Sequence, residues 1–137
     1  MSATARFRTQ HAELIRLVKD LQTDAESPNM DGRALRSSLS GLGGKITMHL
    51  AMEDDSLYPR MRSHSNPAVG TMATRFSEEM QGIKSAFQAF SERWSAQKIE
   101  GDRASFRNEM QAIFSALENR IQRENNELYA LYDTVHQ

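Results

Sequence analysis

Cysteine is absent from the 137 residues of the chain, and its absence excludes several kinds of site. Disulfides, thiolate catalysis and cysteine-ligated zinc or iron–sulfur centres all require a cysteine sulfur. No apolar run approaches the ~20 residues that a membrane-spanning helix needs. The first residues, MSATARFRTQHAEL, contain no continuous apolar stretch of the secretory kind. We therefore expect a protein of the reducing cytoplasm with no membrane partner.

Proline and glycine are scarce, at three and seven residues. Turn-forming residues gather in three stretches, 23–32, 63–70 and 95–102. Elsewhere the sequence has no alternating apolar pattern of useful length and no repeat of solenoid period. The chain therefore divides into four helical segments. Its length and its composition, 39% hydrophobic and 26% charged, suit one domain over residues 1–137.

Opposite charges nearly balance, which argues against nucleic acid as a partner. The formal net charge is −1 at pH 7, so no overall field attracts a polyanion. The last helical segment carries several arginines, but acidic residues interleave with them and no basic stripe results. We predict no nucleic-acid partner.

Each helical segment has core-type positions at alternating spacings of four and three, the period of one buried helix face. The predicted stripes are Phe7, His11, Leu14, Val18 and Leu21; Leu35, Leu39, Leu42, Ile46, His49, Glu53 and Leu57; Met72, Phe76, Glu79, Ile83, Ala86 and Phe90; and Phe106, Met110, Ile113, Leu117, Arg120, Glu124 and Leu128. Four such stripes with short connections predict an all-α fold, an antiparallel four-helix bundle with up-down-up-down topology.

The second segment contains residues that usually interrupt a helix. Pro59 should kink or end it, because proline lacks a backbone donor. Gly41, Gly43 and Gly44 lie in its interior. They indicate either close approach of a neighbouring helix or a locally weak helix.

Six polar residues occupy stripe positions where leucine would be expected. They are His11, His49, Glu53, Glu79, Arg120 and Glu124. A buried carboxylate is very costly unless it is paired or binds a metal. The alternating helix directions allow all six side chains to meet in one layer of the bundle. The pattern indicates either a buried metal centre or a core of ion pairs and hydrogen-bonded histidines.

The pair of His49 and Glu53 is the most informative. Lying four residues apart, the two side chains project from one helix face and can bind one ion or two adjacent ions. Such a pair occurs by chance in many helices, but a second histidine and two more glutamates on core faces favour a metal. Glu79 and Arg120 could instead form a buried ion pair. Histidines with carboxylates suit iron or manganese, and zinc is also compatible.

Three segments resemble a known family. HLAMEDDSLYPRM at 49–61 resembles the H-x-x-x-E-[ED]-x-x-L-[YF]-P signature of hemerythrin-like (HHE cation-binding) domains. FRTQHAEL at 7–14 resembles the first-helix histidine region, and RIQRENNELYAL at 120–131 looks like a second copy of the motif in the fourth helix. The resemblance implies a helical bundle that holds one or two non-haem iron ions. It also implies binding or sensing of dioxygen or nitric oxide, or sensing or storage of iron.

The resemblance further implies a ligand set with two departures. The matching positions are His11, His49, Glu53 and Glu124. Arg120 stands in place of the fourth-helix histidine, and its permanent charge prevents it from being a ligand. It is expected behind the ligands, paired with Glu79 or Glu124. In place of the third-helix histidine the chain offers Glu79 or Met80, and the heptad spacing favours Glu79 as a ligand.

Charge counting predicts how many ions the site would hold. Glu53, Glu79 and Glu124 contribute −3 and Arg120 contributes +1, which leaves −2. One divalent ion neutralises this charge, whereas two leave +2 and need a bridging hydroxide or oxide. We therefore predict one tightly held ion, and a second ion only with such a bridge. Without metal, the same negative charge should raise the pKa of both histidines.

Three functions fit these observations. The first is a non-haem metal-binding protein, with iron as its expected cofactor, for oxygen, nitric oxide or iron sensing, binding or storage. The second is a degenerate, metal-free bundle that acts through an unknown protein partner, and Arg120 favours it. The third is a carboxylate-bridged metal oxidase, which is less expected because the sequence has no nucleophile–base pair and no phosphate loop.

Overall fold

The computed structural model describes residues 4–29 and 31–135, and all regular structure within them is helical. The long helices are α1 (Ala5–Glu26), α2 (Gly32–Met52), α4 (Pro67–Arg93) and α6 (Arg103–Arg123). The short helices are α3 (Tyr58–Arg62), α5 (Ala96–Gly101) and α7 (Ala130–Val135). Two π-helical stretches, η1 (Glu53–Leu57) and η2 (Glu124–Tyr129), join α2 to α3 and α6 to α7.

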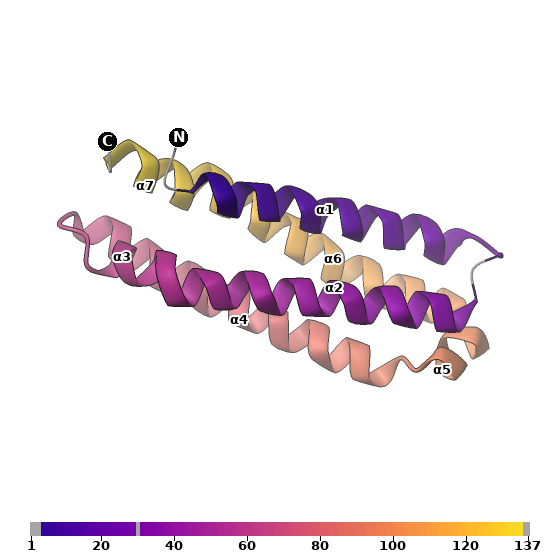
Figure 1. Cartoon of the computed structure of the whole chain (residues 1–137). Coiled ribbons are helices and arrows are strands. Elements are labelled where there is room, and N and C mark those ends of the chain that lie inside the picture. The colour runs from indigo at the N-terminus through magenta and orange to yellow at the C-terminus, as the bar shows by residue number, and fades with distance from the viewer. Residues whose placement is uncertain (1–3, 30, 136–137) are drawn as a thin grey trace.

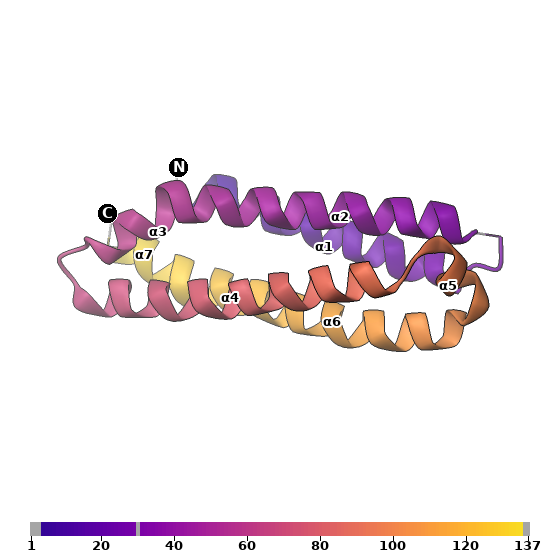
Figure 2. The ribbon, with the colours of Figure 1, turned by 90° about the horizontal axis from the view of Figure 1, so that it is seen from below.

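The long helices lie lengthwise beside one another and form a bundle (Figure 1). α1 packs against α2 and α6, and α4 packs against the same two helices. Figure 2 shows α5 at one end of the bundle and α3 and α7 at the other. No helix in the described ranges is long and apolar enough to cross a membrane. The predicted all-helical class is confirmed.

The buried apolar side chains form two clusters that follow each other along the bundle. The larger cluster includes Leu14, Leu35, Ile46, Leu50, Phe90, Phe114 and Ile121. The smaller cluster includes Phe7, Leu57, Phe76, Leu128 and Tyr132. Burial of each large apolar side chain contributes roughly 1.5–3 kcal/mol to folding. On α1, and where α2 continues into η1 and α6 into η2, the chain passes from one cluster to the other through a buried polar residue.

The predicted stripes are confirmed on α1 and along α2 and η1, where all their members are buried. On α4 and α6 the prediction is wrong at several positions. Met80 rather than Glu79 is buried on α4, and Ile121 rather than Arg120 on α6. Spacings of three and four both keep to one helix face. The helices turn to bury the apolar neighbour because burying a charged group is costly. The same one-residue shift affects Met72, Ala86 and Ile113.

Pro59 changes the helix type without ending the helical run. The α-helical part of the second segment ends at Met52, and Pro59 lies in the first turn of α3. A missing N–H costs little in a first turn. Before it, the N–H of Tyr58 donates to the carbonyl of Glu53, five residues back, in the widened turn. The chain therefore passes the proline through η1.

The glycines of α2 differ in their surroundings. A Cβ added at Gly43 would lie 2.9 Å from Cε1 of Phe87 on α4, so this glycine marks close approach of a neighbouring helix. Gly41 and Gly44 have open space around the corresponding position.

The structure also differs from the prediction in the stretch 95–102, where turn-forming residues predicted a connection without regular structure. It contains the short helix α5, which begins because the side chain of Ser95 accepts from the N–H of Lys98.

Candidate metal centre

Four polar side chains from different parts of the chain meet between the two apolar clusters. His11 comes from α1 and His49 from the last turn of α2, while Glu53 and Glu124 are the first residues of η1 and η2. None is more than 2% exposed. One nitrogen or oxygen from each lies within 4.8 Å of those from the others. The structure therefore brings together four of the predicted site residues.

Hydrogen bonds to amide oxygens orient both imidazoles. Nδ1 of His11 lies 2.7 Å from Oδ1 of Asn125, and Nδ1 of His49 lies 2.6 Å from Oε1 of Gln10. An amide oxygen only accepts, so each Nδ1 carries the hydrogen and each Nε2 keeps a lone pair. The Gln10 amide nitrogen donates to Sδ of Met52 at 3.2 Å, which fixes the direction of its oxygen. Both Nε2 atoms are thus prepared to bind a metal.

Three of the four inward-facing atoms lack a hydrogen-bond partner. Nε2 of His49 and Oε1 of Glu53 and of Glu124 are buried without one. Nε2 of His49 lies 2.8 Å from Oε1 of Glu53, and Nε2 of His11 lies 3.3 Å from Oε1 of Glu124. Neighbouring ligands of an ion with bonds of about 2.1 Å are roughly 3.0–3.4 Å apart. Leaving a buried polar atom unpaired costs roughly 1–3 kcal/mol. A cation would satisfy all of them, so the donor set fits a metal ion.

Two fully buried tyrosines hold the outer carboxylate oxygens. The Tyr129 hydroxyl donates to Oε2 of Glu53 at 2.6 Å, and the Tyr58 hydroxyl donates to Oε2 of Glu124 at 3.1 Å. Each tyrosine therefore donates to the glutamate of the other helical run, and the two bonds tie η1 and the start of α3 to η2. The Tyr129 ring also stacks on His11, with the centroids 5.2 Å apart and the planes within 6°.

The π-helical turns explain how these tyrosines reach the site. EDDSLY at 53–58 and ENNELY at 124–129 share the pattern Glu-x-x-x-Leu-Tyr. The leucine and the tyrosine of both copies are buried. Hydrogen bonds between residues five apart widen a turn, so that both side chains face the interior. The sequence-based prediction missed Tyr58 and Tyr129, although the repeated spacing was the signal that could have found them.

Glu79 and Arg120 lie apart from the four ligand-type residues. They pair with each other between α4 and α6, and the guanidinium lies 5.2 Å from the centre of the Phe76 ring. Of the two partners expected for Arg120, the structure pairs it with Glu79. Along the part of the chain that the structure describes, α4 brings no histidine or carboxylate into the cluster.

Burial dominates the electrostatics of the metal-free site. Desolvation and the nearby His11 lower the pKa of His49 to about 3. Desolvation, together with the hydrogen bond and charge of Glu124, raises the pKa of Glu53 well above its usual range. Desolvation also acts to raise the pKa of Glu124, but hydrogen bonds with Glu53 and His11 leave it lowered. The expectation of a raised pKa is wrong for His49, because the charge count omitted desolvation.

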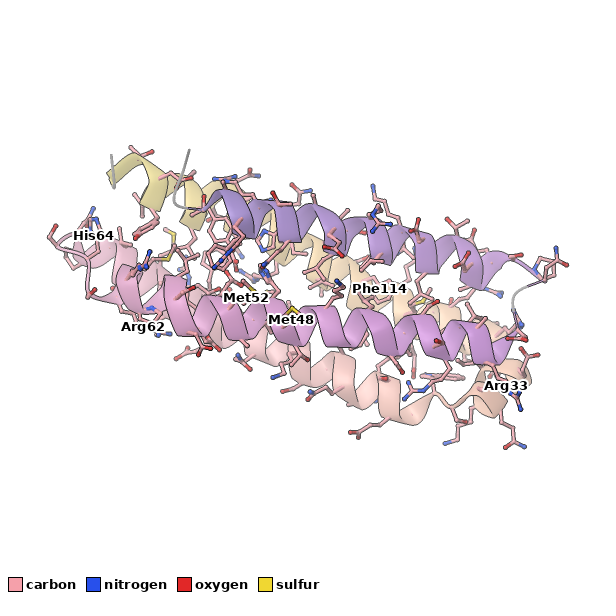
Figure 3. All side chains as sticks on the ribbon, viewed as in Figure 1. Arg33, Met48, Met52, Arg62, His64 and Phe114 are labelled. Carbon is pink, nitrogen blue, oxygen red and sulfur yellow. The ribbon has the colours of Figure 1, made fainter. Side chains whose placement is uncertain are left out.

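The surroundings of the site include a small cavity. It has a volume of about 90 Å³, lies between α1 and α2, and reaches the His49 ring. An ion pair of 3.2 Å between Glu13 and Lys45 lies among its lining residues, which also include Met48 (Figure 3).

His64, which the sequence places in a turn, lies outside the buried cluster. It belongs to the turn between α3 and α4, where its Nδ1 accepts from the N–H of Asn66.

Comparison with known proteins adds an independent observation. The family model of the hemerythrin HHE cation-binding domain matches residues 2–132. No curated protein and no solved structure matches the chain. The matched range covers all four buried ligand-type residues and both copies of the Glu-x-x-x-Leu-Tyr pattern.

Proposed function

Because the chain belongs to the hemerythrin HHE cation-binding domain family, we propose that it is a non-haem metal-binding protein. The proposed ligands are His11, His49, Glu53 and Glu124. The observation that carries the proposal is the buried cluster of inward-facing atoms, three of which have no hydrogen-bond partner. In this proposal residues 1–137 form one domain. The domain is an up-down-up-down antiparallel four-helix bundle, a topology that the arrangement in Figures 1 and 2 supports.

Iron is the proposed cofactor, with manganese or zinc as compatible ions. Two imidazoles and two carboxylates form a borderline-to-hard donor set, which suits divalent iron and manganese. Glu53 and Glu124 contribute −2, while Glu79 and Arg120 neutralise each other outside the cluster. One divalent ion therefore balances the charge of the site.

A bound iron would give the protein affinity for dioxygen or nitric oxide. Alternatively, the protein would store or sense iron in the cytoplasm. The chain supplies the surroundings. Gln10 and Asn125 keep both imidazoles in the metal-binding tautomer, and the apolar clusters on either side limit access of water. The cavity of about 90 Å³ beside His49 has room for a diatomic molecule or a few waters. This size favours binding or sensing over the oxidation of a bulky substrate.

The metal-free alternative depended on Arg120. Its guanidinium pairs with Glu79 and lies over Phe76 rather than between the imidazoles and carboxylates. The arginine therefore leaves the four inward-facing atoms without a cation, and the position of Arg120 favours metal binding over a closed ion-pair core.

The test is metal content per chain, measured on protein purified without a metal-binding tag and again after anaerobic ferrous reconstitution. We expect iron close to one per chain, with near-ultraviolet charge-transfer absorption in air. His49→Ala should lose both, while His64→Ala, which changes a histidine in a turn, should keep both. A wild-type protein that takes up neither iron nor manganese would refute the proposal.

A further inference from the structure

The two oxygens of each site carboxylate have different surroundings. Oε1 of Glu53 and of Glu124 face the cluster and have no hydrogen-bond partner. Oε2 of both residues already accepts a tyrosine hydroxyl, at 2.6 Å for Glu53 and 3.1 Å for Glu124. Each carboxylate thus offers one oxygen to the site and keeps the other engaged.

We propose that Tyr58 and Tyr129 restrict the site to a single ion, an inference that rests on the proposed metal binding. A carboxylate that bridges two ions uses both oxygens, one for each ion. With a hydroxyl held against Oε2, Glu53 and Glu124 bind through Oε1 alone. The tyrosines are therefore positioning residues that determine how many ions the protein holds.

The tyrosines are held firmly enough to impose this limit. Both are fully buried and belong to the smaller apolar cluster. Tyr129 is also stacked on the His11 ring. Because each hydroxyl bonds to the glutamate of the other helical run, moving either one would disturb both η1 and η2.

The size of the cluster agrees with one ion. Paired ions in two-metal sites lie about 3.5–4 Å apart. Ligands at the two ends of such a pair would be separated by much more than the 4.8 Å within which one donor atom from each of the four residues lies. A second ion would also find no imidazole on α4, where Phe76 and Met80 are the buried residues on that part of the helix.

Removing the hydroxyls should therefore open a second position. The double variant Tyr58→Phe/Tyr129→Phe releases both Oε2 atoms, and their negative charge then needs a new partner. A second divalent ion with a bridging hydroxide from water can supply it. Tyr132→Phe is the matched control, because this buried tyrosine lies in the same cluster and its ring meets His64 at a centroid distance of 6.1 Å.

Divalent manganese is the probe, since it is stable in air and its paramagnetic resonance spectrum distinguishes an isolated ion from a coupled pair. Elemental analysis after dialysis gives the number of ions per chain. We expect one isolated ion in the wild type and in Tyr132→Phe. In the double variant we expect a second ion and the spectrum of a coupled pair.

Two results would overturn the inference alone: a wild type that holds two ions, or a folded double variant that still holds one isolated ion. A wild type that binds no ion would overturn the proposed function, and this inference with it. Circular dichroism checks folding. If the double variant does not fold, the single variants decide, because each releases one Oε2. Unchanged ion counts and spectra in both single variants would equally overturn the inference.

Discussion

Acid should destabilise the metal-free protein through His49. Burial and the nearby His11 lower the pKa of this residue from 6.5 to about 3. Between these values the unfolded chain binds a proton that the folded protein does not. The stability that depends on neutral His49 is therefore present above the unfolded pKa and is lost as the pH falls through this window. The loss is about 1.4 kcal/mol per pH unit, or roughly 3 kcal/mol over two units.

Glu53 acts in the opposite direction. Burial, with the hydrogen bond and charge of Glu124, raises the pKa of Glu53. Its contribution to stability is therefore present at low pH and is lost as the pH rises above the usual carboxyl range. The pH dependence of the wild type combines both slopes. The variant His49→Gln keeps Glu53 and removes the titrating imidazole, so the difference between the two proteins isolates the histidine.

The assay is denaturant unfolding in the presence of a chelator, at about pH 6.5 and about pH 4.5. Relative to the wild type, His49→Gln should gain roughly 2 kcal/mol between the first condition and the second, because the unfolded imidazole is already half protonated at the first. His64→Gln serves as the control and should follow the wild type. Parallel stability curves for the wild type and His49→Gln would refute the assignment of a buried neutral imidazole.

Three further predictions test other parts of the structure. Gln10→Met and Asn125→Leu remove the acceptors that fix the imidazole tautomers, so calorimetric titration should show metal affinity reduced about 10–100-fold; unchanged affinity would contradict the proposed orientation. Arg120→Met should leave the ion count per chain unaltered, because the guanidinium pairs outside the cluster; an altered count by elemental analysis would place it in the site. Gly44→Ala should stabilise the protein by about 1 kcal/mol, whereas Gly43→Ala should destabilise it by about 1–3 kcal/mol because of Phe87. Thermal unfolding separates the two, and equal effects would refute the difference in packing.

The helical class and the four residues that meet in the buried cluster were predictable for a simple reason. A buried histidine or glutamate on an otherwise apolar stripe is easily recognised, because little else explains it. Prediction failed where an apolar and a charged residue were adjacent in the sequence, so that either could continue the stripe. Spacing alone allowed Glu79 or Met80 on α4, and Arg120 or Ile121 on α6, and only packing decided between them.

The tyrosines could not be found by the same reasoning. In a regular α-helix a residue five positions after a core residue does not share its face, so Tyr58 looked unrelated to Glu53. The widened turns η1 and η2 change that relation, and Pro59 was the one local sign that regular helix geometry would be interrupted. The repeated Glu-x-x-x-Leu-Tyr pattern could have singled out the two tyrosines, but π-helical turns have no simple sequence rule, so only the structure explains why both side chains face the site.

The two departures from the family's ligand pattern explain each other. Arg120 replaces a histidine and would, by its charge alone, compete with a cation for the glutamates. Glu79 on α4 pairs with the guanidinium, and the pair leaves the net charge of the central cluster at that of Glu53 and Glu124. If the cluster binds metal as proposed, the two departures reduce the number of imidazole ligands without removing the negative charge that attracts an ion. A protein altered in this way should keep metal binding while the number of ions decreases, which is the outcome that the engaged Oε2 atoms also favour.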